Sequence, residues 1–211
     1  MMESSGLREA NKARTRSAIS EVATRLFVQR GFENVTVAEI AEAAHVSVKT
    51  VFNYFSSKEE LFFDRMDDVR DAIVAAVRER PEGVSVLESL HELFTQRRVP
   101  FDDTGWRPLH DPERYADFRS FLAAEHASPA LRARRLTIAE SWTTWFEELL
   151  AEEVDAREAK VLAALIVALI ALRDRELSAA MLEGASARTV ERRVRGLMDE
   201  GFARLSRAFP Q

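Results

Sequence analysis

The chain has 211 residues, and 46% of them are hydrophobic, which is enough apolar material for one or two domains with a buried core. It contains no cysteine, which excludes a disulfide framework and thiolate chemistry and agrees with a cytoplasmic location. The net charge of −5 is uneven: residues 1–58 carry eight basic and six acidic side chains, and the remainder carries 22 and 29.

The composition predicts an all-α protein. Glycine and proline are few, and Ala, Leu, Arg and Glu, which favour helices, dominate the sequence. Val, Ile, Thr and Tyr do not form the alternating runs that indicate strands. The longest apolar run, residues 161–172, is too short to span a membrane. No apolar signal-peptide core follows the polar N-terminus.

The first predicted helix begins at about Leu7 or Lys12 and ends at Arg30. Gly31 supplies the stop. Its apolar residues recur at helical spacing and form one stripe: Ile19, Val22, Ala23, Leu26 and Phe27.

Two short helices follow. Thr36 and Glu39 form a capping box at the start of the first, in which side chain and backbone satisfy each other's hydrogen bonds. Residues 45–47 form the turn, and Ser47 caps the next helix. The predicted buried face of the first is Val37, Ile40, Ala41 and Ala44, and that of the second is Val48, Val51, Phe52 and Phe55.

The rest of the chain is predicted to be helical apart from a loop over about residues 99–111. A second capping box, Ser57 to Glu60, starts a helix that runs to about Arg80. The later helices span about Val84–Arg98, Pro112–His126, Ser128–Glu153, Asp155–Gly184 and Ser186–Phe209, with Asp155 and Ser186 as caps.

Residues 36–55 form a two-helix unit with a three-residue turn, and an amphipathic helix precedes it. This pattern is typical of a helix-turn-helix. The second helix presents Lys49, Thr50, Asn53 and part of Tyr54 outward, with no carboxylate among them. Such a face suits a major groove, because base edges offer donors and acceptors and phosphates repel anions.

Residues 18–62 resemble the TetR family of transcriptional regulators. The segment AISEVATRLFVQRGFENVTVAEIAEAAHVSVKTVFNYFSSKEELF follows the family pattern without a gap. The matching positions are Phe27, Gly31, Phe32, Thr36, Ile40, Ala41, Ala44, Val46, Ser47, Phe55, Lys58 and Leu61. The resemblance implies a ligand-responsive DNA-binding regulator, in most relatives a repressor, and not an enzyme.

The resemblance also implies roles for single residues. Thr36 is expected to donate to a phosphate, and Tyr54 and Lys58 to contact phosphates. Arg16 adds charge from the N-terminal arm. The groove-facing side chains are expected to be Ser47, Lys49, Thr50 and Asn53. Thr36 and Ser47 also cap helices, and that role alone would explain them.

Three departures from the family pattern make the DNA contacts specific to this chain. Phe52 stands where many relatives have tyrosine, so a phosphate-directed hydroxyl is missing. Lys49 stands where many have glycine, which adds a possible base or phosphate contact. Val48 replaces a position that is frequently polar.

The remainder of the chain resembles the family in architecture. We therefore expect a helix-turn-helix domain over residues 7–57 and an effector-binding and dimerisation domain over 58–211. The resemblance implies a homodimer through the last two helices, because the apolar faces of both exceed what one subunit needs to fill. Such a dimer would hold two recognition helices about 34–36 Å apart on a palindromic operator of double-stranded DNA.

The predicted effector pocket is lined by large apolar side chains of the middle helices, and we expect a hydrophobic or acyl-like small molecule. The candidates are Phe94, Trp106, Phe118, Leu122, Trp142, Trp145 and Phe146, with Phe101 and Phe121 in the same class. The same residues also suit an ordinary core. Arg132, Arg134 and Arg135 either meet an anionic ligand group or are surface charge.

Two other classes of function compete with this one. The Glu-x-x-His pairs Glu42–His45 and Glu88–His91 have the spacing of a di-iron helical bundle, but matching carboxylates are not placed around them. We expect no metal or other cofactor. A helical protein-interaction module is the second alternative, and it predicts no salt-dependent DNA binding.

Overall fold

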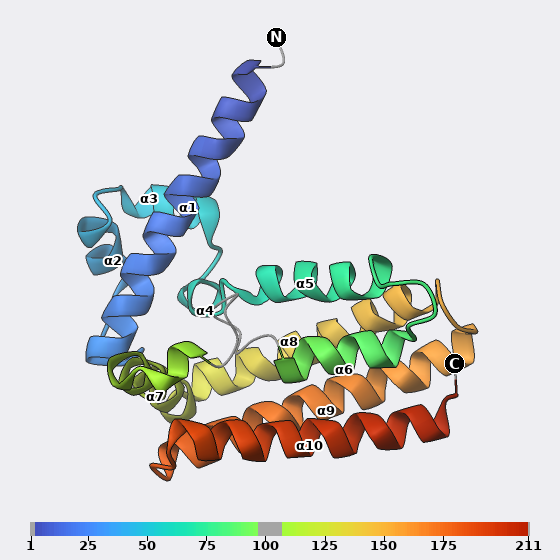
Figure 1. Ribbon diagram of the computed structural model, residues 1–211. Coiled ribbons are helices and arrows are strands. Elements are labelled where there is room, and N and C mark those ends of the chain that lie inside the picture. Colours follow the sequence, from blue (N-terminus) through green and yellow to red (C-terminus); the bar gives the residue numbers. More distant parts are fainter. Residues whose placement is uncertain (1–2, 97–106, 211) are drawn as a thin grey trace. The chain divides into compact units, whose positions relative to one another are not determined.

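The computed structural model describes residues 3–96 and 107–210, and within these residues it contains helices and no strand. The prediction of an all-α protein is confirmed. The α-helices are α1 (Glu3–Arg30), α2 (Val37–Ala43), α3 (Val48–Tyr54), α4 (Lys58–Phe62), α5 (Met66–Arg78), α6 (Val86–Gln96), α7 (Pro112–Ala127), α8 (Pro129–Leu150), α9 (Ala156–Leu182) and α10 (Ala187–Ala208), with a 3-10 turn η1 (Arg107–His110) before α7 (Figure 1). Among the described helices, none has the length and apolar character needed to cross a membrane.

The predicted caps hold the helix ends. Asp155 accepts hydrogen bonds from the backbone of Arg157 and Glu158 at the start of α9, and Ser186 accepts one from Thr189 at the start of α10. Thr36, Ser47 and Ser57 likewise cap α2, α3 and α4. Each of these side chains satisfies a backbone N–H that has no partner inside its helix.

The structure corrects the predicted helix from Ser57 to Arg80. It is two helices, because α4 ends at Phe62 and α5 begins at Met66. Leu61, Phe62 and Phe63 are all buried. The backbone N–H of Phe63 still donates to the Glu59 carbonyl, so the helical hydrogen bonds of α4 stop only after Phe63. The break that follows coincides with the point where the chain passes from one compact unit to the other, between Asp64 and Arg65.

The second capping box also differs from its prediction. Ser57 does accept from the backbone N–H of Glu60, at 3.1 Å. The Glu60 carboxylate, however, accepts from the backbone and the hydroxyl of Ser56, one residue earlier than a reciprocal box requires. A complete box that was not predicted starts α6, where Ser85 and Glu88 bond each other's backbone N–H, and residues 85–88 do have the Ser-x-x-Glu pattern of such a box.

The chain divides into two compact units. The first contains Met1–Asp64 and Ser120–Arg132, and the second contains Arg65–Arg119 and Ala133–Gln211. The second half of α7 and the first turn of α8 therefore belong to the first unit. The predicted division into a helix-turn-helix domain that ends at residue 57 and an effector-binding and dimerisation domain that begins at residue 58 stays a proposal.

An aromatic cluster forms the centre of the first unit. The Phe62 ring lies 5.5 Å from Phe27 and 5.7 Å from Phe32, and it stacks on Phe121 of α7 at 4.1 Å with an interplanar angle of 11°. The Ser128 hydroxyl, which is fully buried, donates to the Glu33 carboxylate. These interactions explain why residues 120–132 pack with the N-terminal helices.

In the second unit α10 packs against α9 and α6. Its apolar face is buried within the single chain, including Val194, Met198 and Phe202. The prediction that this face exceeds the needs of one subunit is therefore wrong for α10. The approach to α9 is close, because a Cβ added at Gly201 would lie 2.5 Å from a methyl carbon of Leu169.

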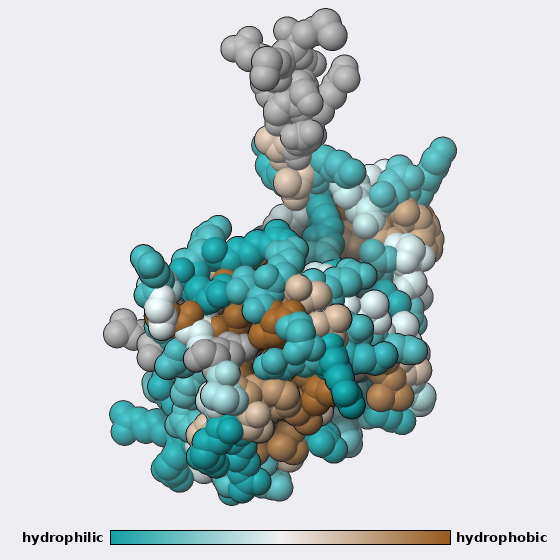
Figure 2. Space-filling model, turned by 90° about the vertical axis from the view of Figure 1, so that its right-hand side faces the viewer, coloured by the Kyte–Doolittle hydropathy of each residue, from teal (hydrophilic) through white to brown (hydrophobic). Residues whose placement is uncertain are grey.

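The surface of the protein is mainly hydrophilic, but apolar side chains interrupt it (Figure 2). On α9 the exposed apolar residues include Val161, Leu165 and Leu172, which are 45%, 40% and 39% exposed. They recur at spacings of four and seven, so they lie along one side of the helix. α9 therefore leaves a row of apolar side chains uncovered.

Candidate nucleic-acid interface

The predicted recognition helix, α3, buries fewer residues than its sequence pattern predicts. Val51 and Phe55 are each 1% exposed and form its inner side. Val48 and Phe52 were predicted to join them, but they are 40% and 51% exposed. That prediction is wrong, because a helix of only seven residues rests on the core with one narrow strip and leaves the neighbouring positions in solvent.

Three of the four polar side chains of α3 lie where the sequence places them, and Thr50 is more buried than predicted. Lys49 and Asn53 are exposed, whereas Thr50 and Tyr54 are partly buried. Within α3 itself, which is fully described, there is no acidic residue. The outward surface therefore offers a cation and an amide without a carboxylate that would repel phosphates.

Two of the predicted DNA-binding residues are bonded to each other. The Ser47 oxygen accepts from the backbone N–H of Thr50 at 3.0 Å, and the two hydroxyl oxygens are 2.7 Å apart. The pair fixes the start of α3, where the chain enters from the turn. His45 in that turn has φ of +55°, a left-handed conformation that histidine adopts more readily than most residues with a side chain.

Thr36 is part of a complete capping box at the start of α2. Its hydroxyl donates to the Glu39 carboxylate at 2.7 Å and accepts from the Glu39 backbone at 3.2 Å. Arg30, at the end of α1, also donates to this carboxylate, at 2.7 Å. To donate to a phosphate, as predicted, the Thr36 hydroxyl must give up its bond to Glu39.

The same hydrogen bonds lower the pKa of Glu39 to about 2 from 4.5, chiefly through the bond from Arg30 and then through those from Thr36. A folded-state pKa below the unfolded one means that ionised Glu39 stabilises the fold. This contribution is present above about pH 4.5 and is lost as the pH falls towards 2.

We expect the variant Glu39→Gln to be less stable than the unchanged protein at neutral pH and to approach it as the pH falls from about 4.5 towards 2. Urea unfolding at a series of pH values measures this difference. Glu42→Gln, in the same helix but outside the box, is the control. A difference that grows towards acid would contradict the assignment.

Lys58 lies where the helix-turn-helix meets α4. Its ammonium group donates to the backbone carbonyls of Phe32 and Val35, at 2.9 and 3.0 Å, and lies 4.1 Å from the centroid of the Phe32 ring. An ammonium has three N–H donors, so one remains after these two bonds. The predicted phosphate contact by Lys58 stays a prediction, and the structure adds a role in holding the turn after α1.

Arg16 is engaged within the first unit. Its guanidinium forms an ion pair with Asp64 and lies 5.2 Å from the centroid of the Phe55 ring. The pair links α1 to the end of α4 and the aromatic core. The predicted DNA contact by Arg16 stays a prediction, and it requires the guanidinium to share or leave Asp64.

Three of the candidate effector residues lie together on α8. The rings of Trp142, Trp145 and Phe146 have centroids 4.9 to 6.3 Å apart, and Arg70 of α5 lies 4.7 Å from the Trp145 centroid. Trp142 and Phe146 are buried, at 8% and 0% exposed. The structure thus brings these three residues together and adds a cation from another helix.

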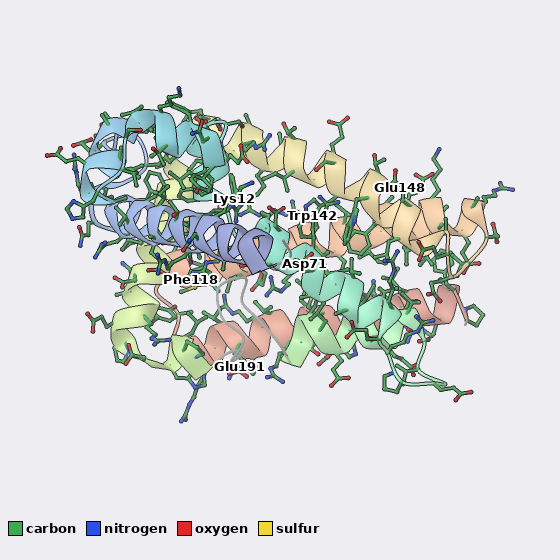
Figure 3. The ribbon with its side chains drawn as sticks, turned by 90° about the horizontal axis from the view of Figure 1, so that it is seen from above. Lys12, Asp71, Phe118, Trp142, Glu148 and Glu191 are labelled. Atoms are coloured by element: carbon green, nitrogen blue, oxygen red, sulfur yellow. The ribbon has the colours of Figure 1, made fainter. Side chains whose placement is uncertain are left out.

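The other candidates lie on other elements. Phe94 of α6 stacks on Phe202 of α10 at 6.4 Å. Phe118 of α7 is buried in the second unit (Phe118 and Trp142 are labelled in Figure 3), whereas Leu122 belongs to the first. Trp106 and Phe101 lie outside the described residues. The whole set therefore stays a prediction.

One of the two Glu-x-x-His pairs, Glu88–His91, has other partners. Glu88 belongs to the capping box with Ser85, and the His91 ring nitrogen lies 2.7 Å from the Asp199 carboxylate of α10. Across residues 3–96 and 107–210, no group of three or more His, Cys, Asp or Glu side chains is placed to hold a metal ion.

Sequence reasoning missed two features of this interface. Arg30 was predicted only as the last residue of a helix, yet it bonds both Glu39 and the backbone of Asn34. A basic residue in the last turn of a helix, followed by a short loop and an acidic first turn, is the signal that was present in the sequence. The exposure of Phe52 had one signal, because many relatives have a phosphate-directed tyrosine at this position, but the apolar spacing of α3 favoured the buried side.

Comparison with known proteins agrees with this geometry. Residues 19–64 match the family described as bacterial regulatory proteins, tetR family. The chain is 37% identical over 89 residues to the HTH-type transcriptional regulator TcmR of Streptomyces glaucescens, covering 42% of this chain and 39% of TcmR. It is 26% identical over 145 residues to the HTH-type transcriptional repressor NicS of Pseudomonas putida, covering 62% of this chain and 57% of NicS.

These curated relatives are thus matched over about two fifths to three fifths of their length. Among solved structures, a TetR transcriptional regulator from Rhodococcus sp. RHA1 has a TM-score of 0.55 at 18% identity, covering 92% of this chain and 98% of that one. At that identity the similarity shows a shared fold alone.

Proposed function

We propose that this chain is a transcriptional regulator of the TetR family that binds a palindromic operator as a homodimer and is released from it by a small, largely hydrophobic effector. The observation that carries the proposal is the outward surface of α3. It presents Lys49 and Asn53 to solvent, beside the capped N-terminus of a helix that rests on a rigid aromatic core. A helix with such a surface can enter a major groove and contact base edges.

Dimerisation is supported by the uncovered apolar side of α9. Val161, Leu165 and Leu172 are exposed in the single chain, and a second copy would remove their apolar surface from water. The apolar side of α10 is already buried. We therefore propose that α9 supplies most of the apolar surface of a two-fold interface and that α10 borders it.

Effector binding is supported by the aromatic cluster of α8. Trp142, Trp145 and Phe146 offer a large apolar surface, and Arg70 lies against Trp145. Aromatic walls with a few polar groups are typical of small-molecule sites. A ligand releases DNA to the extent that it prefers the conformation in which the two recognition helices no longer fit successive grooves.

The test is DNA binding by the purified protein to the region upstream of its own gene, and to duplexes selected from random sequence, at several salt concentrations. We expect tight binding, with the logarithm of the association constant falling linearly with the logarithm of the salt concentration. Lys49→Ala is expected to weaken binding by about 1–3 kcal/mol if Lys49 bonds a base. If Lys49 bonds a phosphate, the variant should instead reduce the salt slope by about one for each phosphate that it no longer neutralises.

Arg119→Ala is the control, because Arg119 is an exposed basic residue on α7, outside the first unit and not on the helix proposed for the dimer interface. It should leave both the affinity and the salt slope unchanged. Failure to bind the upstream region and failure to select any duplex would together reject the proposed function and favour a protein-interaction module. Equal losses in Lys49→Ala and Arg119→Ala would reject α3 as the reading element.

A further inference from the structure

The exposed surface of α3 is divided lengthwise into an apolar and a polar row. Each helical residue is rotated by about 100° from the last, so residues four apart lie about 40° apart. Val48 and Phe52 are four apart, and so are Lys49 and Asn53. All four are exposed, whereas Val51 is buried. The apolar row therefore runs beside the polar row and continues the same surface.

We propose that the apolar row reads thymine, with Phe52 packing on the 5-methyl group of a thymine in each operator half-site and Val48 contributing a second apolar contact. This inference rests on the proposed function. The thymine methyl is the apolar group that B-DNA presents in the major groove, and phenylalanine is among the side chains that contact it. Every other base edge there presents hydrogen-bonding atoms, which a phenyl ring would deprive of water without replacing the bond.

Continuity with the polar row identifies DNA, and not another protein, as the occupant. Phe52 is 51% exposed and Val48 40%, and their neighbours on the same side are Lys49 and Asn53. A partner protein that covered the apolar row would also cover the ammonium of Lys49. A duplex meets both rows at once, because the methyl group lies on the base edge and the phosphates border the groove.

Phe52 would then determine specificity without making a hydrogen bond. A cytosine in place of the thymine offers an amino group and no methyl, so Phe52 should discriminate between the two pyrimidines. The ring is also separate from the core, because Val51 and Phe55 form the inner side of α3. Phe52 can therefore be shortened with little effect on folding.

The test replaces each thymine of the selected operator by deoxyuridine, which removes only the 5-methyl group. We expect the unchanged protein to lose about fourfold in affinity for each methyl that the ring had covered. Phe52→Ala should bind the thymine duplex more weakly than the unchanged protein does. At the contacted position, it should bind the thymine and deoxyuridine duplexes equally. Lys49→Ala, the control on the polar row, should keep the thymine-to-uracil ratio.

Several results would overturn the inference. The inference is wrong if the unchanged protein binds thymine and uracil duplexes equally at every half-site position. It is also wrong if the thymine-to-uracil affinity ratio persists in Phe52→Ala. A change of sedimentation coefficient in Phe52→Ala would assign the apolar row to a protein contact. Selection of no duplex at all would reject the proposed function together with the inference, whereas tight operator binding without sensitivity to the methyl group would reject the inference alone.

Discussion

Replacing Phe62 by alanine is expected to lower the free energy of unfolding by about 3–5 kcal/mol. Phe62 is 5% exposed, and its ring contacts those of Phe27, Phe32, Phe63 and Phe121. Alanine would leave a cavity between α1, α4 and α7, and the surrounding rings can close it only in part. The free energy of unfolding is measured by urea denaturation followed by circular dichroism.

Phe62→Leu is the matched variant, because it keeps most of the apolar volume but removes the stacked ring. It should lose less stability than Phe62→Ala. Operator binding should fall with the folded fraction of the first unit, since the recognition helix rests on the same core. A loss below about 1 kcal/mol in Phe62→Ala would show that the cluster does not hold this unit together.

Replacing Lys58 by methionine is expected to lower the free energy of unfolding by about 2–4 kcal/mol, because hydrogen bonds to charged groups contribute more than neutral ones. Methionine keeps much of the aliphatic length but cannot donate to the carbonyls of Phe32 and Val35. The Val35 carbonyl then loses this partner, and the Phe32 carbonyl keeps only the longer bond from the Val35 backbone N–H, at 3.4 Å. Urea denaturation again measures the loss.

Operator binding separates the two roles of Lys58. Binding is measured under conditions in which the variant is folded. If Lys58 has only a structural role, the salt slope of the variant is unchanged. If Lys58 contacts a phosphate, the loss of that contact reduces the magnitude of the slope by about 0.9 for each half-site. Lys49→Met, an exposed lysine of α3, is the control for stability. Equal stabilities of Lys58→Met, Lys49→Met and the unchanged protein would contradict the structural role.

The two lysines show how far the sequence predicts the site. Lys49 was predicted to face outward, and the structure places it in solvent. Lys58 was predicted from family resemblance to contact a phosphate, and the sequence carried no sign that its ammonium bonds two carbonyls more than twenty residues earlier in the chain. Hydrogen bonds at that separation follow from the way α4 folds back on the turn after α1, which no local pattern specifies.

Local chemistry determined much of this protein by sequence alone. Helix formers and helix caps affect only residues a few positions away in the chain. The all-α class and most helix starts were therefore predictable, the latter from the caps Thr36, Ser47, Asp155 and Ser186. Tertiary packing decided the break at residues 63–65, the exposure of Phe52 and the burial of the apolar side of α10. Each of these depends on which neighbour covers a surface, and that is determined only when segments distant in the chain meet.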